Sequence, residues 1–395
     1  MKIKIMIPAL IMFATLAANG IFNYGTSLEL LNKTHSSVSF GLGLITGPII
    51  GLVLAKPITM LLHKFDNHLL STIGLVGATL SMLLYSFFIS DNKAMVYTAV
   101  LFLSINGVFM RIFNYAYMNN QIYIVGEDHI QQLNALEQGS ISVLQIVNPI
   151  ITALLWAWIG LPNTLWVAVG ISLIGIVLLP RVKYQGVRSA DDNAALPSFK
   201  MVVASVLKQP TVRKVFLLET LLGIFLVSEI VAIPYILVTG GFVTEKYLGL
   251  VQGIAGIGAV VGASVAFFKK TPNALKILRV TTISIGALYL ILAFMFGITS
   301  KTAALVAVVI VSMAISLIST FASPISYTAM QTSLSEETRA DVITWYYTIQ
   351  EMVYPIGAAL VSILMVGISP TKLYLLYGFM IIIIGLVVMR GKQNA

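Results

Sequence analysis

Hydrophobic residues occur along this chain in runs of about 20, without the strict alternation expected of a transmembrane β-strand. One long polar interval, residues 181–214, interrupts the pattern and leaves two hydrophobic segments of nearly equal length. An apolar run of this length crosses a bilayer as an α-helix, in which the backbone N–H and C=O groups bond to one another. The pattern therefore predicts an all-α polytopic membrane protein with two similar halves.

The expected division of the chain is an N-terminal six-helix bundle over 1–180, a cytoplasmic linker loop over 181–214 and a C-terminal six-helix bundle over 215–395. The twelve transmembrane helices are predicted near residues 1–24, 36–62, 68–90, 94–118, 133–158, 162–180, 215–238, 245–268, 273–296, 302–328, 341–367 and 371–389. Within the linker, the stretch FKMVVASVL at 199–207 predicts a short amphipathic helix on the inner membrane surface.

The composition agrees with lipid as the main solvent. Hydrophobic residues make up 58% of the 395 and charged residues 10%, and the mean hydropathy is +0.94. The chain has no cysteine, which excludes disulfides, thiolate metal sites and cysteine nucleophiles. It also lacks the motifs of serine hydrolases, P-loop nucleotide sites and zinc proteases. We therefore expect no enzyme activity and no cofactor, and transport that is passive or driven by a gradient.

The formal net charge of +9 comes from 24 Lys and Arg against 15 Asp and Glu. If the N-terminus lies in the cytoplasm, most of these cations fall in cytoplasmic segments, as the positive-inside rule requires. Membrane topology therefore explains the charge better than nucleic-acid binding does. We expect both termini and the linker to face the cytoplasm.

Charged side chains within the predicted spans are the first candidates for function, because a charge in lipid is costly unless it is paired or reaches water. Arg111 in the fourth span and Glu137 at the start of the fifth are expected at similar depths and form a candidate pair. The pair either takes part in gating and proton coupling or is a static salt bridge. Lys56 and Glu219 lie near the inner ends of their spans, where long side chains extend to the headgroups.

Two glutamates near the middle of predicted spans are the main candidates for proton coupling. Glu229 lies in the seventh span, and Glu351 lies in the eleventh with Tyr347 and Tyr354 on the same helix face. A carboxyl that is protonated when sealed from water and ionised when a cavity opens supplies what a proton-coupled carrier requires. The alternative is an acid that stays protonated and hydrogen-bonded within the bundle.

The fifth predicted span carries polar side chains along one side of the helix, at about 100° per residue. This polar stripe consists of Asn134, Gln138, Ser142, Gln145 and Asn148. Amides that faced lipid would be strongly unfavourable, so the stripe faces either neighbouring helices or a water-filled cavity. We favour a substrate cavity, with Tyr347 and Tyr354 as further candidate members.

Two weaker patterns concern packing and internal repetition. Glycines recur in the eighth span at Gly249, Gly253, Gly258 and Gly262, and glycines four apart let another helix approach closely. The fifth and eleventh spans each follow an acidic segment, 127–128 and 336–337, that we place in inner loops. Each of these spans also has a proline near its middle, Pro149 and Pro355.

Nearly the whole chain resembles carriers of the major facilitator superfamily, and more narrowly the macrolide-efflux-like branch of drug:proton antiporters. The best segments are 133–157 (LNALEQGSISVLQIVNPIITALLWA), with GVFMR before it, and 324–331 (PISYTAMQ), with SEETRADV after it. The segments IVAIPYILV and LGLVQGIAGIGAVVGA are also similar to the family. The resemblance implies alternating access, in which the two halves move about a central site.

Two segments depart from the family pattern. The loop between the second and third spans usually reads Asp-Arg-x-x-Arg-Lys, whereas this chain has His63 at the first position and Asn67-His68 at the later basic pair. In the fifth span, Asn148-Pro149 stands where the antiporters have Gly-Pro. The usual inner charge network is therefore incomplete here, and the signature of antiport over symport is weaker.

The leading hypothesis is a secondary active transporter that exports hydrophobic or macrolide-like drugs and is driven by protons. Its expected partners are a small-molecule substrate, protons and the lipid bilayer, without nucleic acid. We expect a monomer in a bacterial plasma membrane. The alternatives are a dedicated exporter or importer of an endogenous peptide or metabolite, a lipid translocase, and a membrane sensor that transports nothing.

Overall fold

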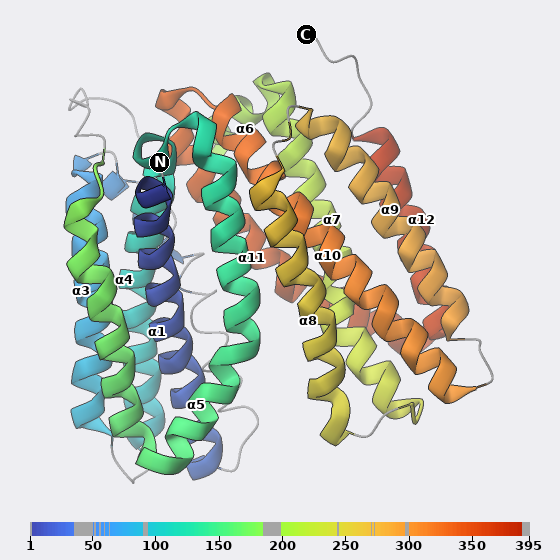
Figure 1. Cartoon of the computed structure of the whole chain (residues 1–395), viewed down its shortest axis with the longest axis horizontal. Coiled ribbons are helices and arrows are strands. Elements are labelled where there is room, and N and C mark those ends of the chain that lie inside the picture. Colours follow the sequence, from blue (N-terminus) through green and yellow to red (C-terminus); the bar gives the residue numbers. More distant parts are fainter. Residues whose placement is uncertain are drawn as a thin grey trace. The chain divides into compact units, whose positions relative to one another are not determined.

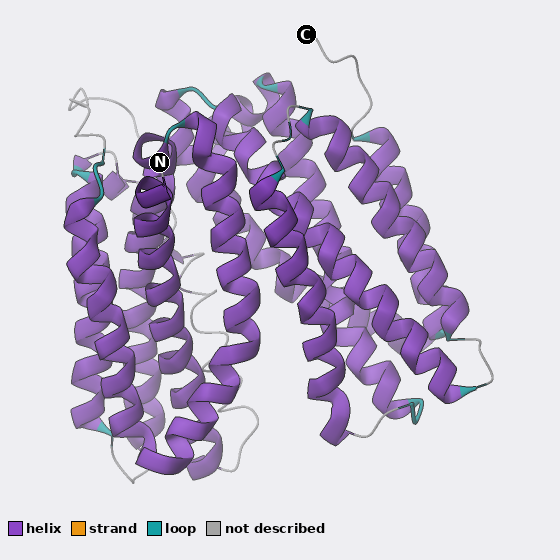
Figure 2. Ribbon diagram, in the orientation of Figure 1, coloured by secondary structure: helices purple, strands orange, loops and turns teal. Residues whose placement is uncertain are grey.

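A computed structural model of the chain describes residues 2–34, 50, 53–54, 57–58, 60–62, 64–89, 94–184, 199–242, 245–269, 271, 273–296 and 300–388. Within these residues the chain forms α-helices joined by turns and short loops, and no strand (Figure 2). The all-α fold predicted from the hydrophobic pattern is confirmed. The span predicted at 36–62 lies largely outside the described residues.

The helices cover the predicted spans that lie within the described residues, and several of them extend beyond the predicted ends. The first part of the chain contains α1 (Lys2–Thr34), α3 (Asn67–Phe88), α4 (Ala94–Val125), α5 (Glu127–Leu178) and the 3₁₀ turn η1 (Leu179–Arg181). The second part contains α6 (Phe199–Lys208), α7 (Pro210–Thr239), α8 (Glu245–Phe268), α9 (Ala274–Met295), α10 (Lys301–Ser333), α11 (Glu336–Gly367) and α12 (Pro370–Val387). Among the described residues, nine helices are long and apolar enough to cross a membrane, and a shorter apolar helix covers Gly253–Phe268.

Helix α5 contains two predicted spans and has a sharp break between them. Gly160 has φ 74° and ψ 168°, values outside the helical range that glycine adopts without a side-chain clash. Pro162 follows two residues later and suits the first turn of the next helical part, because its missing N–H is not needed there. The two predicted spans, 133–158 and 162–180, therefore correspond to the two parts of α5.

The acidic segments at 127–128 and 336–337 are not loops, and this expectation was wrong. They begin α5 and α11, respectively. Gly126, with φ 84°, forms the connection from α4, and Glu127 and Asp128 lie in the first turn of α5. Acidic side chains are favourable at this end because the free N–H groups and the helix dipole attract negative charge. Both helices therefore start several residues earlier than predicted.

Contacts divide the chain into two compact units. The first unit comprises Met1–Leu133, Val143–Val202 and Glu336–Thr348, and within it α4 packs against α3 and α1 (Figure 1). The second comprises Asn134–Ser142, Val203–Ser335 and Ile349–Ala395, and within it α8 packs along α10 and α9 along α12. The division into halves at 1–180 and 215–395 stays a prediction.

Glycines on α8 bring its backbone against α10 in the second unit. A Cβ at Gly258 would overlap the carbonyl group of Met313, and a Cβ at Gly262 would overlap that of Leu317. Gly253 has no atom within 4 Å of the same position. The helix-packing role predicted for the glycine series is thus confirmed at Gly258 and Gly262, four residues apart on one face.

Candidate functional site

Glu229 lies inside the second unit, on α7. Its side chain is half-buried, and its Oε1 atom is buried without a hydrogen-bond partner. Ser312 of α10 and Tyr289 of α9 lie next to the carboxyl group. Each of these hydroxyls is able to donate to an ionised carboxylate or accept from a protonated one. The surroundings of Glu229 therefore suit both protonation states.

Tyrosines from α9 and α12 build the wall beside Glu229. The Ser228 hydroxyl donates to Tyr289 Oη (3.2 Å), which donates to the carbonyl of Phe225 (3.2 Å), and Tyr374 Oη donates to the carbonyl of Ser228 (3.5 Å). Tyr289 and Tyr374 are fully buried within the apolar cluster that joins α7, α9, α10, α11 and α12. These bonds fix the two rings against α7 at the level of Glu229.

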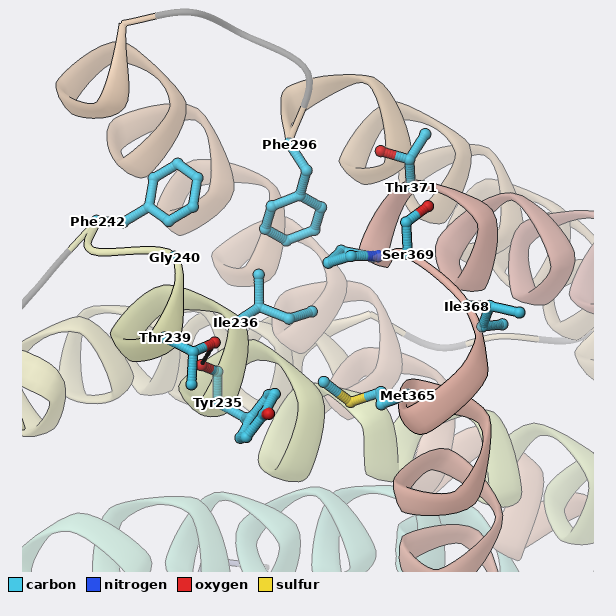
Figure 3. Close-up of a pocket in the computed structure, with 11 residues that line it drawn as sticks. Tyr235, Ile236, Thr239, Gly240, Phe242, Phe296, Met365, Ile368, Ser369 and Thr371 are labelled. Atoms are coloured by element: carbon cyan, nitrogen blue, oxygen red, sulfur yellow. Dashed lines mark hydrogen bonds between the residues drawn. The ribbon is translucent and has the colours of Figure 1, made fainter.

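A pocket of about 430 Å³ lies in the second unit, where α7 and α11 end and α12 begins (Figure 3). This volume falls within the range of roughly 300–1,000 Å³ that is usual for small-molecule sites. Its lining combines apolar, aromatic and hydroxyl side chains: Tyr235, Ile236, Thr239, Gly240, Phe242, Phe296, Met365, Ile368, Ser369, Pro370 and Thr371. We call it the α7–α12 pocket. Its chemistry suits a largely hydrophobic ligand with a few polar groups.

Aromatic rings connect the α7–α12 pocket with the neighbourhood of Glu229. Phe296 lines the pocket, and its ring centroid lies 5.5 Å from that of Tyr374. The Tyr374 ring in turn lies 5.5 Å from that of Tyr289, which is next to the Glu229 carboxyl. Phe296 therefore contacts Tyr374, one of the two tyrosines that form the wall beside Glu229.

The second predicted proton acid, Glu351, is half-buried on α11. Next to it, Gln350 Nε2 donates to Thr220 Oγ1 of α7 at 3.4 Å. Tyr354 is 49% exposed, whereas Tyr347 is half-buried with its ring centroid 6.5 Å from that of Tyr115. The two tyrosines predicted to share a face with Glu351 thus lie in different surroundings.

The polar stripe of α5 makes contacts with two helices. Asn134 Nδ2 donates to Thr328 Oγ1 (2.8 Å) and Gln331 Oε1 (2.9 Å) of α10, and Gln138 Oε1 accepts from Ser323 (3.5 Å). Asn148 Nδ2 donates to the Leu16 carbonyl of α1 (3.5 Å). Ser142 bonds back to the Gln138 carbonyl, and Gln145 is exposed. Contacts with neighbouring helices or within α5 account for Asn134, Gln138, Ser142 and Asn148. The role of the stripe in a substrate cavity stays a prediction.

Arg111 is half-buried on α4 beside Tyr115, one turn further along the same helix face, as its spacing predicted. The Tyr115 hydroxyl is 3.2 Å from Thr348 Oγ1 on α11, in the same unit. Glu137 is buried on α5, with 6% of its surface exposed. The Arg111–Glu137 pair stays a prediction.

Glu29 is a buried acid that the sequence analysis did not single out. Because α1 continues past the predicted end at residue 24, Glu29 lies inside the helix and is 8% exposed. Its Oε2 accepts a hydrogen bond from Trp156 Nε1 of α5 at 2.5 Å. The segment GTSLELLNKT has no proline and several good helix formers, and this signal predicts a longer first helix.

Comparisons with known proteins agree on the family and the fold. The profile of the Major Facilitator Superfamily matches residues 9–358. A search of curated proteins finds no match. Among solved structures, the chain is similar to a bacterial homologue of the iron transporter ferroportin in an outward-facing state, with a TM-score of 0.79, 12% identity, and coverage of 98% of this chain and 99% of that chain.

Two further structures cover the same length. The fucose:proton symporter FucP of E. coli has a TM-score of 0.74 and 14% identity over 98% of both chains. The human organic anion transporter MFSD10 has a TM-score of 0.76 and 10% identity over 98% of both chains. At these identities the likeness concerns the fold, with twelve helices or close to it, and carries no information about the cargo.

Proposed function

The chain belongs to the major facilitator superfamily and is a multi-pass secondary transporter without enzymatic function, and from this premise we propose that protons drive its transport of a hydrophobic small molecule. The observation that carries the proposal is Glu229, a carboxyl group with a buried, unbonded oxygen atom among hydroxyls in the C-terminal part of the chain. Family members carry small molecules and are often coupled to protons. One protein of the same fold is a fucose:proton symporter.

A coupling acid has to be stable in two protonation states during one cycle. Ser312 and Tyr289 supply hydroxyls that reorient when the proton arrives or leaves, so neither state leaves the group without partners. A charged carboxylate in lipid-like surroundings is costly, which favours the protonated form whenever water is excluded. Opening the site to water reverses this preference. Glu351 is the second candidate for the same role.

The α7–α12 pocket supports a hydrophobic cargo. Phe242, Phe296 and Met365 give it aromatic and flexible apolar walls, which accept ligands of varied shape (Figure 3). Through Phe296, Tyr374 and Tyr289, an occupied pocket acts on the surroundings of Glu229. Coupling between cargo and proton therefore has a physical route within one unit.

We propose export as the direction, because the segments 133–157 and 324–331 resemble the macrolide-efflux-like branch of drug:proton antiporters. With both termini in the cytoplasm, the α7–α12 pocket lies at the outer end of the C-terminal helices. An importer or a dedicated metabolite carrier has the same fold and differs in the cargo and direction of flux.

The test is uphill accumulation of a fluorescent cationic dye and of a macrolide in inside-out vesicles, with and without a protonophore. We expect the wild type to accumulate cargo and to lose it when the protonophore is added. Glu229→Gln should lose uphill accumulation and keep downhill exchange, because the variant still binds cargo but carries no proton. Asp128→Asn, which changes an exposed acid in the first turn of α5, is the control and should keep uphill transport.

Full uphill transport by Glu229→Gln would overturn the assignment and direct the test to Glu351→Gln. If no dye or drug accumulates, a panel of peptides and metabolites tests the dedicated carrier, and fluorescent lipids test a translocase. Flux that is present but insensitive to the protonophore would contradict proton coupling as such.

A further inference from the structure

The α7–α12 pocket has an apolar interior and a polar edge. Ile236, Phe296 and Met365 extend into the same space from α7, the end of α9 and α11 (Figure 3). The hydroxyl groups of Ser369 and Thr371 lie where α12 begins, at the edge of this space. Such a division of surfaces suits an amphipathic molecule, which has an apolar body and one polar end.

Lys301, the first residue of α10, places a positive charge beside this edge. Its Nζ donates to the carbonyl of Gly240 at 3.0 Å, and Gly240 belongs to the pocket lining. A Cβ at Gly241 would lie 2.9 Å from the same nitrogen, so the ammonium group lies against the glycine turn that ends α7. The hydrogen bond therefore holds the charge next to the pocket.

The turn at the end of α7 is built to receive this ammonium group. Gly241 has φ 65°, a left-handed conformation that favours glycine, and the Phe242 N–H donates to a carbonyl of α7 at 2.9 Å. Carbonyls in the last turn of a helix lack intrahelical partners, so that of Gly240 is available to Lys301. The turn also places the Phe242 ring 6.3 Å from that of Phe296, measured between centroids. It thus forms a charged edge and an aromatic wall together.

Lys301 keeps the capacity to bind an anion. An ammonium group has three N–H donors, and the bond to Gly240 uses one of them. Among the described residues Lys301 has no acidic partner, and those that line the pocket include no Asp or Glu. Charge-assisted hydrogen bonds to a carboxylate or a phosphate would use the two remaining donors.

The first turn of α12 adds neutral donors to the same edge. Ser369 Oγ accepts from the Lys372 N–H at 3.5 Å, and Pro370 has no N–H to satisfy. The Thr371 N–H has no acceptor within the helix, because amides of the first turn lack intrahelical partners. Its hydroxyl and N–H are therefore both able to donate to a ligand.

The balance of charge at the pocket is positive. The C-terminal ends of α7 and α11 each carry about half a negative charge, and the N-terminal end of α12 carries about half a positive charge. Lys301 and Lys372, both exposed, each add a full positive charge at this end of the second unit. No acidic side chain is described there. The two lysines therefore outweigh the helix ends, and the pocket favours an anion over a cation.

We propose that the α7–α12 pocket binds an anionic amphipath, with a carboxylate or phosphate group at the polar edge and a hydrocarbon body between Ile236, Phe296 and Met365. The inference names the ligand class of the pocket, and it rests on the proposed function only where that ligand is taken to be cargo. Such a molecule has two sources, an anionic lipid of the membrane and a dissolved amphipathic anion.

The test is binding of radiolabelled octyl phosphate to the full-length chain in nanodiscs of zwitterionic lipid, corrected for uptake by empty nanodiscs. We expect saturable binding that octanoate displaces and that octanol and octyltrimethylammonium displace poorly. Lys301→Met should weaken the affinity by about fivefold, the size expected for loss of a partly exposed ion pair. Lys301→Arg should bind like the wild type, because it keeps the charge.

Two further variants make the experiment decisive. Lys276→Met removes an exposed cation at the opposite end of α9 and should bind octyl phosphate like the wild type. Met365→Trp fills the apolar interior of the pocket and should abolish binding, and it supplies the test if Lys301→Met is unstable.

Native mass spectrometry of the purified chain distinguishes the two sources. Phosphatidylglycerol that is retained by the wild type and lost from Lys301→Met identifies a membrane lipid as the occupant. If the two proteins retain the same lipids while octyl phosphate still distinguishes them, the occupant is a dissolved anion.

Equal displacement by octanoate and octyltrimethylammonium, or equal affinity in the wild type and Lys301→Met, would overturn the proposal and leave Lys301 as a cap of α7. Failure of the proposed function would appear differently, as absence of dye flux while octyl phosphate still binds.

Discussion

The side chain of Asn148 on α5 occupies the space beside Gly20 on α1. A Cβ at residue 20 would overlap the Asn148 amide, whose Nδ2 donates to the Leu16 carbonyl at 3.5 Å. Gly20 has no side chain, so the Asn148 side chain fits against the backbone of α1 and the two helices lie close together.

We expect Gly20→Val to lower stability by about 1–3 kcal/mol, because the added methyl groups displace the Asn148 amide and push α1 from α5. Combining it with Asn148→Ala should recover part of the loss. Loss of the monodisperse size-exclusion peak on heating measures the effect. Gly170→Ala is the matched control, since residue 170 has open space around its Cβ position. Equal melting of Gly20→Val and wild type would contradict the contact.

The contact of α8 with α10 gives a second prediction. Gly258→Ala and Gly262→Ala should each destabilise the protein by about 1–3 kcal/mol, because the obstructing atoms belong to the backbone of α10 and cannot rotate away. Gly253→Ala should be neutral or slightly stabilising, because nothing lies near that position and alanine favours the helix. The same melting assay distinguishes the three, and a cost at Gly253 equal to that at Gly258 would argue against the packing.

The sequence predicted the helices well because lipid imposes a simple rule: each crossing needs a long apolar run. The predicted gap between the spans 133–158 and 162–180 coincides with the break at Gly160 in α5, and the spacing of Gly258 and Gly262 marked a packing face. These features depend on residues close together in the chain. Local patterns therefore sufficed.

Partners from distant segments were not predictable in the same way. Periodicity placed Asn134 and Gln138 on one side of α5, but it did not identify Thr328 and Ser323 of α10 as their partners. Glu29 was missed because the polar segment after residue 24 suggested a helix end, whereas α1 continues and α5 covers the acid with Trp156. Burial of a polar residue depends on tertiary contacts that a single sequence does not contain.

The contact of Arg339 with Tyr123 gives a third prediction. Arg339 is 7% exposed, its Nη1 donates to Tyr123 Oη at 3.1 Å, and its guanidinium carbon lies 5.4 Å from the ring centroid. Tyr123→Phe keeps the ring and should cost about 0.5–1.5 kcal/mol for the hydrogen bond. Tyr123→Leu loses the cation–π contact as well and should cost about 0.5–1 kcal/mol more. If melting shows the two variants to be equally stable, the ring contact contributes nothing.

The polar stripe of α5 gives the last prediction, which separates packing from transport. Asn134 is 5% exposed and donates to two side chains of α10, whereas Gln145 is exposed on the same helix. Asn134→Leu should lower stability by about 1–2 kcal/mol, since hydrogen bonds between membrane helices contribute about 0.6 kcal/mol each on average and Leu fits the amide space imperfectly.

Combining Asn134→Leu with Gln331→Leu should cost less than the sum of the single losses, because the two residues share one bond. Gln145→Leu, the counterpart on the exposed part of the stripe, should leave melting unchanged and alter the apparent affinity for a transported dye if the stripe lines the cargo path. An unchanged affinity with normal stability would remove Gln145 from the site and leave the stripe as a set of helix contacts.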